Sequence, residues 1–150
     1  MAMKISTKGQ YGLRAMVDLA VNSSANEHVS LNSIAENQNI SISYLEQVFS
    51  ILRKAGLVKS IKGAQGGYML GDKPENITVG KILRSLEGRL TVVDDPEDSE
   101  SVNKMQFCIK KNVWDQMNAS INKIIDSITL EDLVNEYYKM MNSDAYMYYI

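Results

Sequence analysis

Cysteine, histidine and proline are scarce in this sequence of 150 residues. It has one cysteine, Cys108, one histidine, His28, and two prolines. A cluster of iron and sulfur needs several thiolate or similar ligands, so Cys108 alone does not predict one. No catalytic base lies beside Cys108 in the sequence, and Ser/His/Asp catalysis would have to be assembled from scattered residues without a motif. The sequence therefore predicts a protein that is not an enzyme and that holds no metal or cofactor.

Long hydrophobic runs are also missing. No stretch has the length of a membrane-spanning helix, and no signal-peptide pattern follows the N-terminus. We therefore expect a cytoplasmic protein without membrane contact. A hydrophobic content of 45% over this length is enough for one good core.

The net charge of -2 hides an uneven distribution along the chain. Residues 1–90 hold 11 lysines and arginines against 7 acidic residues, whereas residues 91–150 hold 5 against 11. The basic part is the one expected to face a polyanion such as DNA. Because its positive charge is modest, tight binding to double-stranded DNA favours two such domains presented together by a dimer.

Residues 30–56 have the pattern of two short helices joined by a tight turn. Ser30 is a good N-cap for the first helix, which Asn39 closes. After a turn at residues 40–41, the second helix carries an apolar stripe at helical spacing. That stripe consists of Leu45, Val48, Phe49 and Leu52. The order fits a helix-turn-helix whose second helix enters the DNA major groove.

The other face of this second helix is polar throughout. Its side chains can donate to phosphates or accept from base edges, and they are Ser43, Tyr44, Glu46, Gln47, Ser50, Arg53 and Lys54. Ser43 and Glu46 also fit a capping box, so completing the start of the helix is the structural alternative for these two residues.

A basic, glycine-broken hairpin is predicted next. Residues 57–61 and 68–70 are rich in β-formers, and three glycines lie between them. Glycine allows a close backbone approach, and Lys59 and Lys62 add positive charge, so the hairpin fits the wing of a winged helix-turn-helix. A phosphate-binding P-loop is the rival interpretation, but Lys62 precedes the glycines and no Gly-Lys-Ser/Thr ending follows. A solvated hairpin with structural glycines also stays open.

Two more helices complete a DNA-binding domain predicted for residues 1–90. Ser6 and Thr7 can cap a helix over residues 9–21, whose positive N-terminal end suits a DNA phosphate. Thr78 can cap another helix, which Gly88 ends.

A second part of the chain is predicted for residues 91–150. Residues 94–100 are acidic and broken by proline, which indicates a solvated loop, and a long helix follows over about residues 102–127. Its apolar residues alternate spacings of three and four, as a coiled-coil seam does: Trp114, Met117, Ile121, Ile124 and Ile128. We expect this helix to form a homodimer, and a core helix within one chain is the alternative. Thr129 and Asp132 are predicted to cap a last helix over residues 130–141.

Four segments of the chain resemble the Rrf2 (BadM-type) family of bacterial transcription regulators. They are Met-Lys-Ile-Ser-Thr-Lys-Gly at 3–9, Ser-Tyr-Leu-Glu-Gln at 43–47, Leu-Arg-Lys-Ala-Gly-Leu-Val at 52–58 and Gly-Gly-Tyr at 66–68. The resemblance runs over nearly the whole chain and implies a dimeric winged-helix repressor or activator. By matching position it implies base reading by Ser43 and Glu46, a groove-reaching role for Lys62, and phosphate contacts from Ser6, Lys8 and the second helix. Relatives often carry arginine at the wing position, and lysine is expected to read a groove less selectively.

The same resemblance bears on Cys108. Iron–sulfur members of the family carry three cysteines in and just after the loop before the long helix, and Cys108 matches only the third. The resemblance therefore implies no cluster in this chain. Three interpretations of Cys108 stay open: a small packed hydrophobe, a redox-responsive thiol near several lysines, or a metal ligand.

The C-terminal segments, residues 129–133 and 145–150, resemble the cysteine-metabolism repressors of Gram-positive bacteria within this family. Those repressors are partners of O-acetylserine thiol-lyase, which recognises an isoleucine carboxylate at the end of serine acetyltransferase. The resemblance implies that Ile150, with Tyr148 and Tyr149 beside it, binds this enzyme. The alternative is that the tyrosines pack against the dimer.

These expectations together describe a mainly α-helical protein: a winged helix-turn-helix with a small β-hairpin wing and a long dimerisation helix. The predicted function is a homodimeric DNA-binding repressor of sulfur and cysteine metabolism genes, tuned by O-acetylserine thiol-lyase at its C-terminal tail. One alternative is a redox-sensing regulator of the same fold that acts through Cys108. A second is a protein-interaction adaptor that does not bind DNA.

Overall fold

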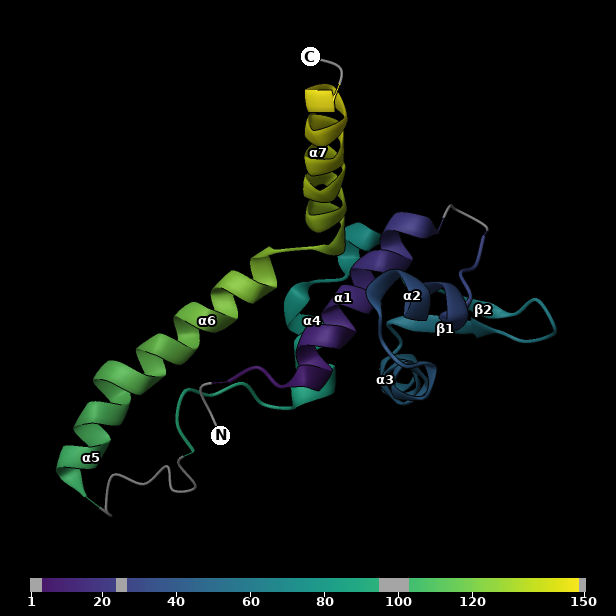
Figure 1. Ribbon diagram of the computed structural model, residues 1–150. Coiled ribbons are helices and arrows are strands. Elements are labelled where there is room, and N and C mark those ends of the chain that lie inside the picture. The colour runs from purple at the N-terminus through teal and green to yellow at the C-terminus, as the bar shows by residue number, and fades with distance from the viewer. Residues whose placement is uncertain (1–3, 24–26, 95–102, 149–150) are drawn as a thin grey trace.

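The computed structural model describes residues 4–23, 27–94 and 103–148, with side chains of the last helix described up to residue 144. Its elements are, in order, α1 (Thr7–Asn22), α2 (Leu31–Gln38), α3 (Ile42–Lys54), β1 (Val58–Ile61), β2 (Gly67–Leu70), the 3-10 turn η1 (Pro74–Asn76), α4 (Val79–Glu87), α5 (Lys104–Ile109), the π-helical turn η2 (Lys110–Trp114), α6 (Asp115–Ser127) and α7 (Leu130–Tyr148). Figure 1 shows a body formed by α1 to α4 and the hairpin, from which two helical arms extend. The predicted class, mainly α-helical with a small hairpin, is confirmed.

The N-terminal ends of the helices are fixed by serine and threonine caps. Ser6, Ser30 and Thr78 each accept a hydrogen bond from the backbone N–H three residues on, as the sequence predicted. The alternative capping box of Ser43 and Glu46 is wrong, because the cap of α3 lies two residues earlier, at Ser41, which accepts from the Tyr44 N–H at 3.3 Å. Ser43 and Glu46 are therefore not used as caps.

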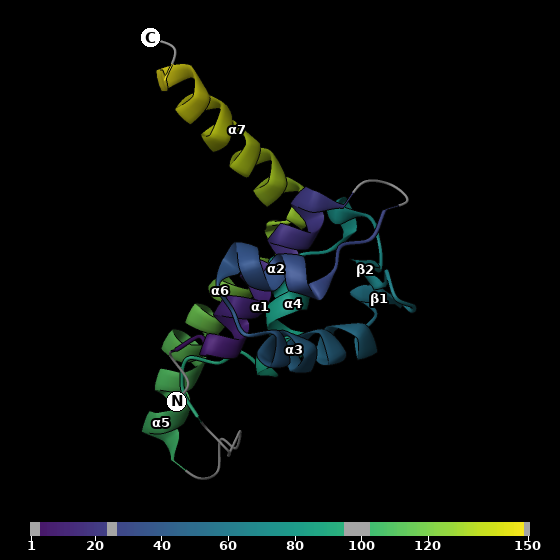
Figure 2. The same cartoon turned by 45° about the vertical axis from the view of Figure 1, so that its right-hand side comes forward.

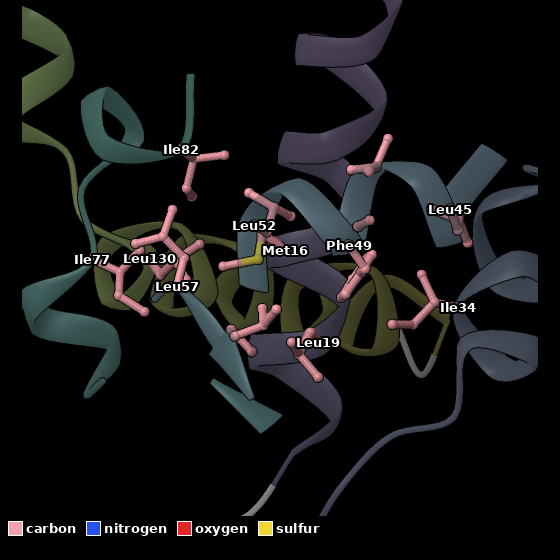
Figure 3. Packing of buried hydrophobic residues seen from close by; sticks show 14 of the residues in the cluster. Met16, Leu19, Ile34, Leu45, Phe49, Leu52, Leu57, Ile77, Ile82 and Leu130 are labelled. Carbon is pink, nitrogen blue, oxygen red and sulfur yellow. The ribbon is translucent and has the colours of Figure 1, made fainter. Parts of the chain in front are cut away.

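One apolar core lies inside the body. The predicted stripe of α3, with Leu45, Val48, Phe49 and Leu52, is buried against α1 and α4. Figure 3 shows Phe49 and Leu52 beside Met16 and Leu19 of α1. Burying side chains of this size stabilises the fold by roughly 1.5–3 kcal/mol each before the cost in conformational entropy.

The core extends into the C-terminal part of the chain through Leu130. This first residue of α7 is fully buried and lies beside Ile77 and Leu57 (Figure 3). Its N–H donates to the Ile77 carbonyl at 2.9 Å, and the Val79 N–H donates to the Ile128 carbonyl at 2.8 Å. The start of α7 is thus anchored on the DNA-binding half, and the division of the chain near residue 90 stays a prediction.

The hairpin is antiparallel, with Val58 opposite Leu70 and Ile61 opposite Gly67. Val29, just before α2, forms an isolated antiparallel bridge with β2 by exchanging hydrogen bonds of 2.9 and 2.8 Å with Tyr68. A side chain on Gly67 would collide with the Val29 backbone, so this position requires glycine. Residues 58–70 are called the wing below.

Helix α5, the turn η2 and helix α6 form one continuous rod that leads away from the body (Figures 1 and 2). A regular helix was predicted here, and the π-helical turn over residues 110–114 is a correction. Of the predicted acidic loop, only Asp94 lies within the described residues. Helix α7 forms a second arm and ends at Tyr148 instead of the predicted Met141. No described helix combines the length and apolar character needed to cross a membrane.

Candidate nucleic-acid interface

The apolar and the polar side chains of α3 differ in burial, as a helix that contacts DNA requires. Its apolar stripe is buried, while the polar side chains predicted to meet DNA lie at the surface. Ser43, Glu46, Gln47, Arg53 and Lys54 are exposed, and Tyr44 and Ser50 are half-buried. The exposed set combines donors and an acceptor suited to base edges with two cations suited to phosphates.

Tyr44 is held in place by aromatic packing against α1. Its ring meets the ring of Tyr11 edge to face, with centroids 5.9 Å apart. The Arg14 guanidinium lies 5.1 Å from the centre of the Tyr11 ring on the same helix. Tyr44 is therefore fixed on one side and available to a ligand on the other.

A polar network that sequence reasoning missed fastens α2 to α1. The buried Asp18 accepts from the Gln38 amide at 2.7 Å and from the Asn22 amide at 2.9 Å. Arg14 in turn donates to the Gln38 carbonyl at 2.6 Å. The only signal in the sequence is a carboxylate next to the inner stripe of α1, and nothing there identifies its partners.

The wing presents Lys62 at the surface beyond β1. Gly63 has a φ of 119°, a conformation that side-chain-bearing residues rarely adopt, and this allows the tight turn after the lysine. The exposed ring of His28 contacts the Gln65 carbonyl and so ties the wing to the segment before α2. Lys62 therefore projects from a hairpin that is anchored at its base and near its tip.

The N-terminus of α1 is already occupied by a carboxylate of the protein itself. Glu87 of α4 accepts from the Ser6 N–H at 3.2 Å and from the Ser6 hydroxyl. The Ser6 oxygen also accepts from the Gly9 N–H at 3.2 Å. Lys8 is exposed. The predicted phosphate contacts of Ser6 and Lys8 stay predictions, and Lys8 is the freer of the two side chains.

The long rod carries an exposed apolar stripe. Met117, Ile121 and Ile124 of the predicted seam are 38, 37 and 59% exposed. Spacings of four, four, four, four and three residues keep the whole stripe on one side, and its members are Met105, Ile109, Val113, Met117, Ile121 and Ile124. Trp114 and Ile128 of the predicted seam are instead half-buried against their own chain. The π-helical turn changes the phase of the helix, which is why extrapolating the heptad pattern missed Met105, Ile109 and Val113.

An ion pair and a hydrogen bond from Arg84 fasten this rod to the body. Arg84 of α4 forms a bidentate pair with Asp126 at 2.7 and 2.9 Å and donates to the Asn122 side chain at 2.7 Å. The hydrogen bond from Arg84 lowers the pKa of Asp126 below its ordinary value of 3.8. A side chain on Gly80 would collide with Asp126, so glycine permits this close approach of α4 and α6.

Cys108 lies on α5 and is exposed. Its neighbour one turn on, Asn112, donates to the Cys108 carbonyl at 2.8 Å and lies 3.7 Å from the thiol sulfur. Among the described residues no three His, Cys, Asp or Glu side chains gather in a group suited to a metal ion. His28 lies beside the wing, at the other side of the fold. Cys108 is thus open to solvent within the single chain.

The three residues predicted to bind a partner enzyme are at the end of the chain. Tyr148 is the last residue of α7, with its side chain beyond the described ones, and Tyr149 and Ile150 lie outside the described residues. Their role stays a prediction.

A helix-turn-helix with an exposed polar second helix, followed by a basic wing, defines a winged-helix DNA-binding protein. Comparison with known proteins agrees. The family model described as Rrf2, iron-dependent transcriptional regulator, matches residues 5–136. The HTH-type transcriptional regulator CymR of Bacillus subtilis is 47% identical over 148 residues, which cover 99% of this chain and 100% of the relative.

Two solved structures extend this likeness to three dimensions. The structure of CymR (YrzC), the global cysteine regulator of B. subtilis, matches with a TM-score of 0.75 and 46% identity, over 89% of this chain and 98% of that one. The oxidized form of Staphylococcus aureus CymR matches with a TM-score of 0.69 and 42% identity, over 88% and 96%. The chain belongs to the Rrf2 family. It is a transcriptional regulator and not an enzyme, and the membership disfavours the adaptor that does not bind DNA.

The iron in the family description has no fitting ligand set in the part of the chain that the structure describes. An iron–sulfur cluster needs several thiolate or similar ligands, whereas this sequence has one cysteine and one histidine, which lie apart. The residues present therefore do not fit the cluster, and no function is derived through it.

Proposed function

We propose that this protein is a homodimeric DNA-binding repressor of genes for sulfur and cysteine metabolism, acting in the cytoplasm. The observation that carries the DNA-binding role is the exposed polar face of α3 beside the anchored wing with Lys62. In the arrangement proposed, α3 lies in the major groove, Ser43 and Glu46 read bases, and Arg53 and Lys54 contact phosphates. Lys62 reaches the adjacent groove or backbone as a point charge.

The exposed stripe on the rod supports the dimer. Six large apolar side chains lie on one side of a helix that contributes no fully buried residue to its own chain. A row of six exposed apolar side chains on a protein surface marks an interaction site. Pairing with the same stripe of a second copy covers it by a self-complementary contact, as two-fold dimers do, and presents two recognition helices to one palindrome.

The proposed target genes are inferred from the name of a relative. Bacillus subtilis CymR is named the global cysteine regulator, and this chain matches it over nearly its full length. The side chains of α3 do not by themselves identify the operator sequence, so the operator has to be found by experiment.

The dimer and the DNA-binding role are tested together by an Ile121→Glu variant. Ile121 lies in the middle of the stripe, so a charge there should prevent pairing without opening the core. Gln116→Glu, on the same helix, adds an equal charge at an exposed polar position and serves as the control. We expect Ile121→Glu to sediment as a monomer and to lose at least about 100-fold affinity for a palindromic operator, while Gln116→Glu behaves as wild type. A monomeric wild type, or a dimeric Ile121→Glu variant with full affinity, would contradict the proposed dimer.

Regulation by O-acetylserine thiol-lyase is the finer part of the proposal. It rests on the resemblance of the C-terminal segment to cysteine-metabolism repressors, and on the place of its residues 145–148 in the last turn of the projecting arm α7. The test compares the full chain with a variant lacking Ile150 for binding to the purified enzyme, with O-acetylserine as competitor. Binding that is lost in the truncated chain and is competed by O-acetylserine agrees with the proposal. Equal affinity of both chains would remove Ile150 from the mechanism.

A further inference from the structure

A half-open pocket of about 480 Å³, called the cavity below, lies between the segment that follows α4 and the middle of the long rod. Neither the DNA-binding face nor the exposed stripe uses it. Its lining comes from two stretches of chain, and consists of Arg89, Thr91, Val93, Asp94, Lys110, Trp114, Asp115 and Asn118.

The walls of this cavity are fixed by specific contacts. The Asn118 side chain accepts from the Val92 N–H at 2.8 Å, and Val92 is itself buried, so the segment after α4 is held against the rod. Trp114 is half-buried, although α5, η2 and α6 contain no fully buried residue. It ends the π-helical turn, and such turns occur frequently at functional sites. The cavity is therefore a formed feature of the described structure.

The charged side chains that line the cavity differ in whether they pair with one another. Lys110 and Asp115 pair with each other at 3.1 Å and offset one another's charge. Arg89 and Asp94, in contrast, form no hydrogen bond or ion pair with any of the described residues, and both are exposed at the cavity. One guanidinium and one carboxylate thus face a common space beside an indole ring.

We propose that this cavity binds a free α-amino acid in its zwitterionic form. Arg89 takes the carboxylate, since a guanidinium can donate two parallel hydrogen bonds to it, and Asp94 takes the ammonium group. The side chain of the ligand rests against the Trp114 ring. A simple organic anion would leave Asp94 unmatched, and a simple cation would leave Arg89 unmatched, so the pair of charges selects a ligand that carries both. The volume lies in the range of small-molecule sites.

This site does not depend on the proposed function. Amino-acid binding can be measured without DNA, and its failure would leave the DNA-binding role untouched. Because the cavity joins the segment after α4 to the rod, a bound ligand contacts both the DNA-binding half and the dimerisation helix.

Trp114 supplies the readout, because it is the only tryptophan in the chain. The full-length protein is titrated with each of the twenty standard amino acids while its tryptophan fluorescence is followed. We expect a saturable change with at least one of them. The N-acetyl and methyl ester derivatives of that amino acid, which each lack one charge, should bind at least about 10-fold more weakly, because each loses a hydrogen bond between two charged groups.

Two variants test whether Arg89 and Asp94 bind the charged groups of the ligand. Arg89→Met and Asp94→Asn change exposed side chains without described partners, so both should fold, and each should weaken binding by at least about 10-fold. Lys123→Met removes an exposed charge elsewhere on α6 and should bind as wild type. The proposal is overturned if no amino acid gives a saturable change, if the N-acetyl derivative binds as tightly as the parent, or if binding persists unchanged in both Arg89→Met and Asp94→Asn.

Discussion

At the scale of single residues, the recognition helix divides its exposed side chains into two kinds. Glu46 is an acceptor for which base reading is proposed, whereas Arg53 is a cation near the C-terminal end of the helix. Removing a base contact should change which sequences bind, and removing a phosphate contact should change how tightly all of them bind. The two residues therefore form a matched pair of tests.

We predict that Glu46→Ala lowers discrimination at one base pair of the half-site by about 1–3 kcal/mol, because one side chain that reads a base edge is lost. Arg53→Ala should weaken binding to all sequences alike and reduce the salt slope of log K by about one. Fluorescence anisotropy with an operator and its single-base variants, at several salt concentrations, measures both. An unchanged specificity profile for Glu46→Ala would remove this residue from base reading.

The role of the Cys108 thiol also belongs to the scale of single residues. Its side chain is exposed in the single chain, so it does not pack there as a small hydrophobe, and the redox-responsive thiol stays a hypothesis.

If Cys108 is a sensor, peroxide should lower the operator affinity of the wild type, and Cys108→Ser should keep its affinity at every peroxide concentration because it has no thiol to oxidise. Anisotropy after peroxide titration, with recovery by dithiothreitol, is the measurement. Equal oxidant sensitivity of the two proteins would exclude this route, and oxidation of methionines such as the exposed Met105 would then be the source of any loss.

At the scale of elements, the attachment of the rod to the body depends on Arg84. Its bidentate pair with Asp126 and its bond to Asn122 join α4 to α6 at a point where Gly80 allows close approach. This contact helps to set the direction of the rod relative to α3. It also makes part of the stability depend on pH, since the folded protein holds the pKa of Asp126 below 3.8.

The direction in which stability changes with pH follows from the linkage between proton binding and folding. A carboxyl group whose pKa is lower in the folded state stabilises the fold above its unfolded pKa, and this contribution is lost as pH falls through the folded value. We predict that the Tm of Asp126→Asn is lower than that of the wild type at pH 7, and that this difference shrinks below about pH 4. Asp144→Asn, an exposed carboxylate without a described partner, should show no such difference. Thermal unfolding followed by circular dichroism from pH 7 to about pH 3 gives the answer, and a pH-independent difference would assign another role to the pair.

Elements also show where sequence reasoning succeeds and where it stops. Caps and buried stripes are local, so Ser30, Thr78 and the α3 stripe were predicted correctly. The start of α3 after the turn at residues 40–41 was predicted correctly, but its cap was not, because Ser41 and Ser43, two residues apart, can both cap a helix. The π-helical turn leaves no pattern in the sequence, and it moved the exposed stripe toward Met105. Contacts between distant segments, such as Glu87 with Ser6, depend on tertiary packing and could not be predicted.

At the scale of the whole molecule, the surfaces discussed above lie on different parts of the fold. The body carries the DNA-binding face, the rod carries the exposed stripe, and α7 points away as a second arm (Figures 1 and 2). The uneven charge fits this separation, because the elements of the body all come from the basic part of the sequence, residues 1–90, and both arms come from the acidic part, residues 91–150. Leu130 at the base of α7 joins the arms to the core, so a signal received at an arm has a packed route to the body.

The central claim is that two copies of this chain bind one palindromic operator through α3 and the wing. The most direct measurement is selection of genomic DNA fragments by the purified protein at near-physiological salt, followed by sequencing. The account predicts enrichment of a palindrome whose half-sites lie about one DNA turn, ~34 Å, apart, upstream of genes for sulfur or cysteine metabolism. Recovery of no common sequence, or of isolated half-sites without symmetry, would contradict it.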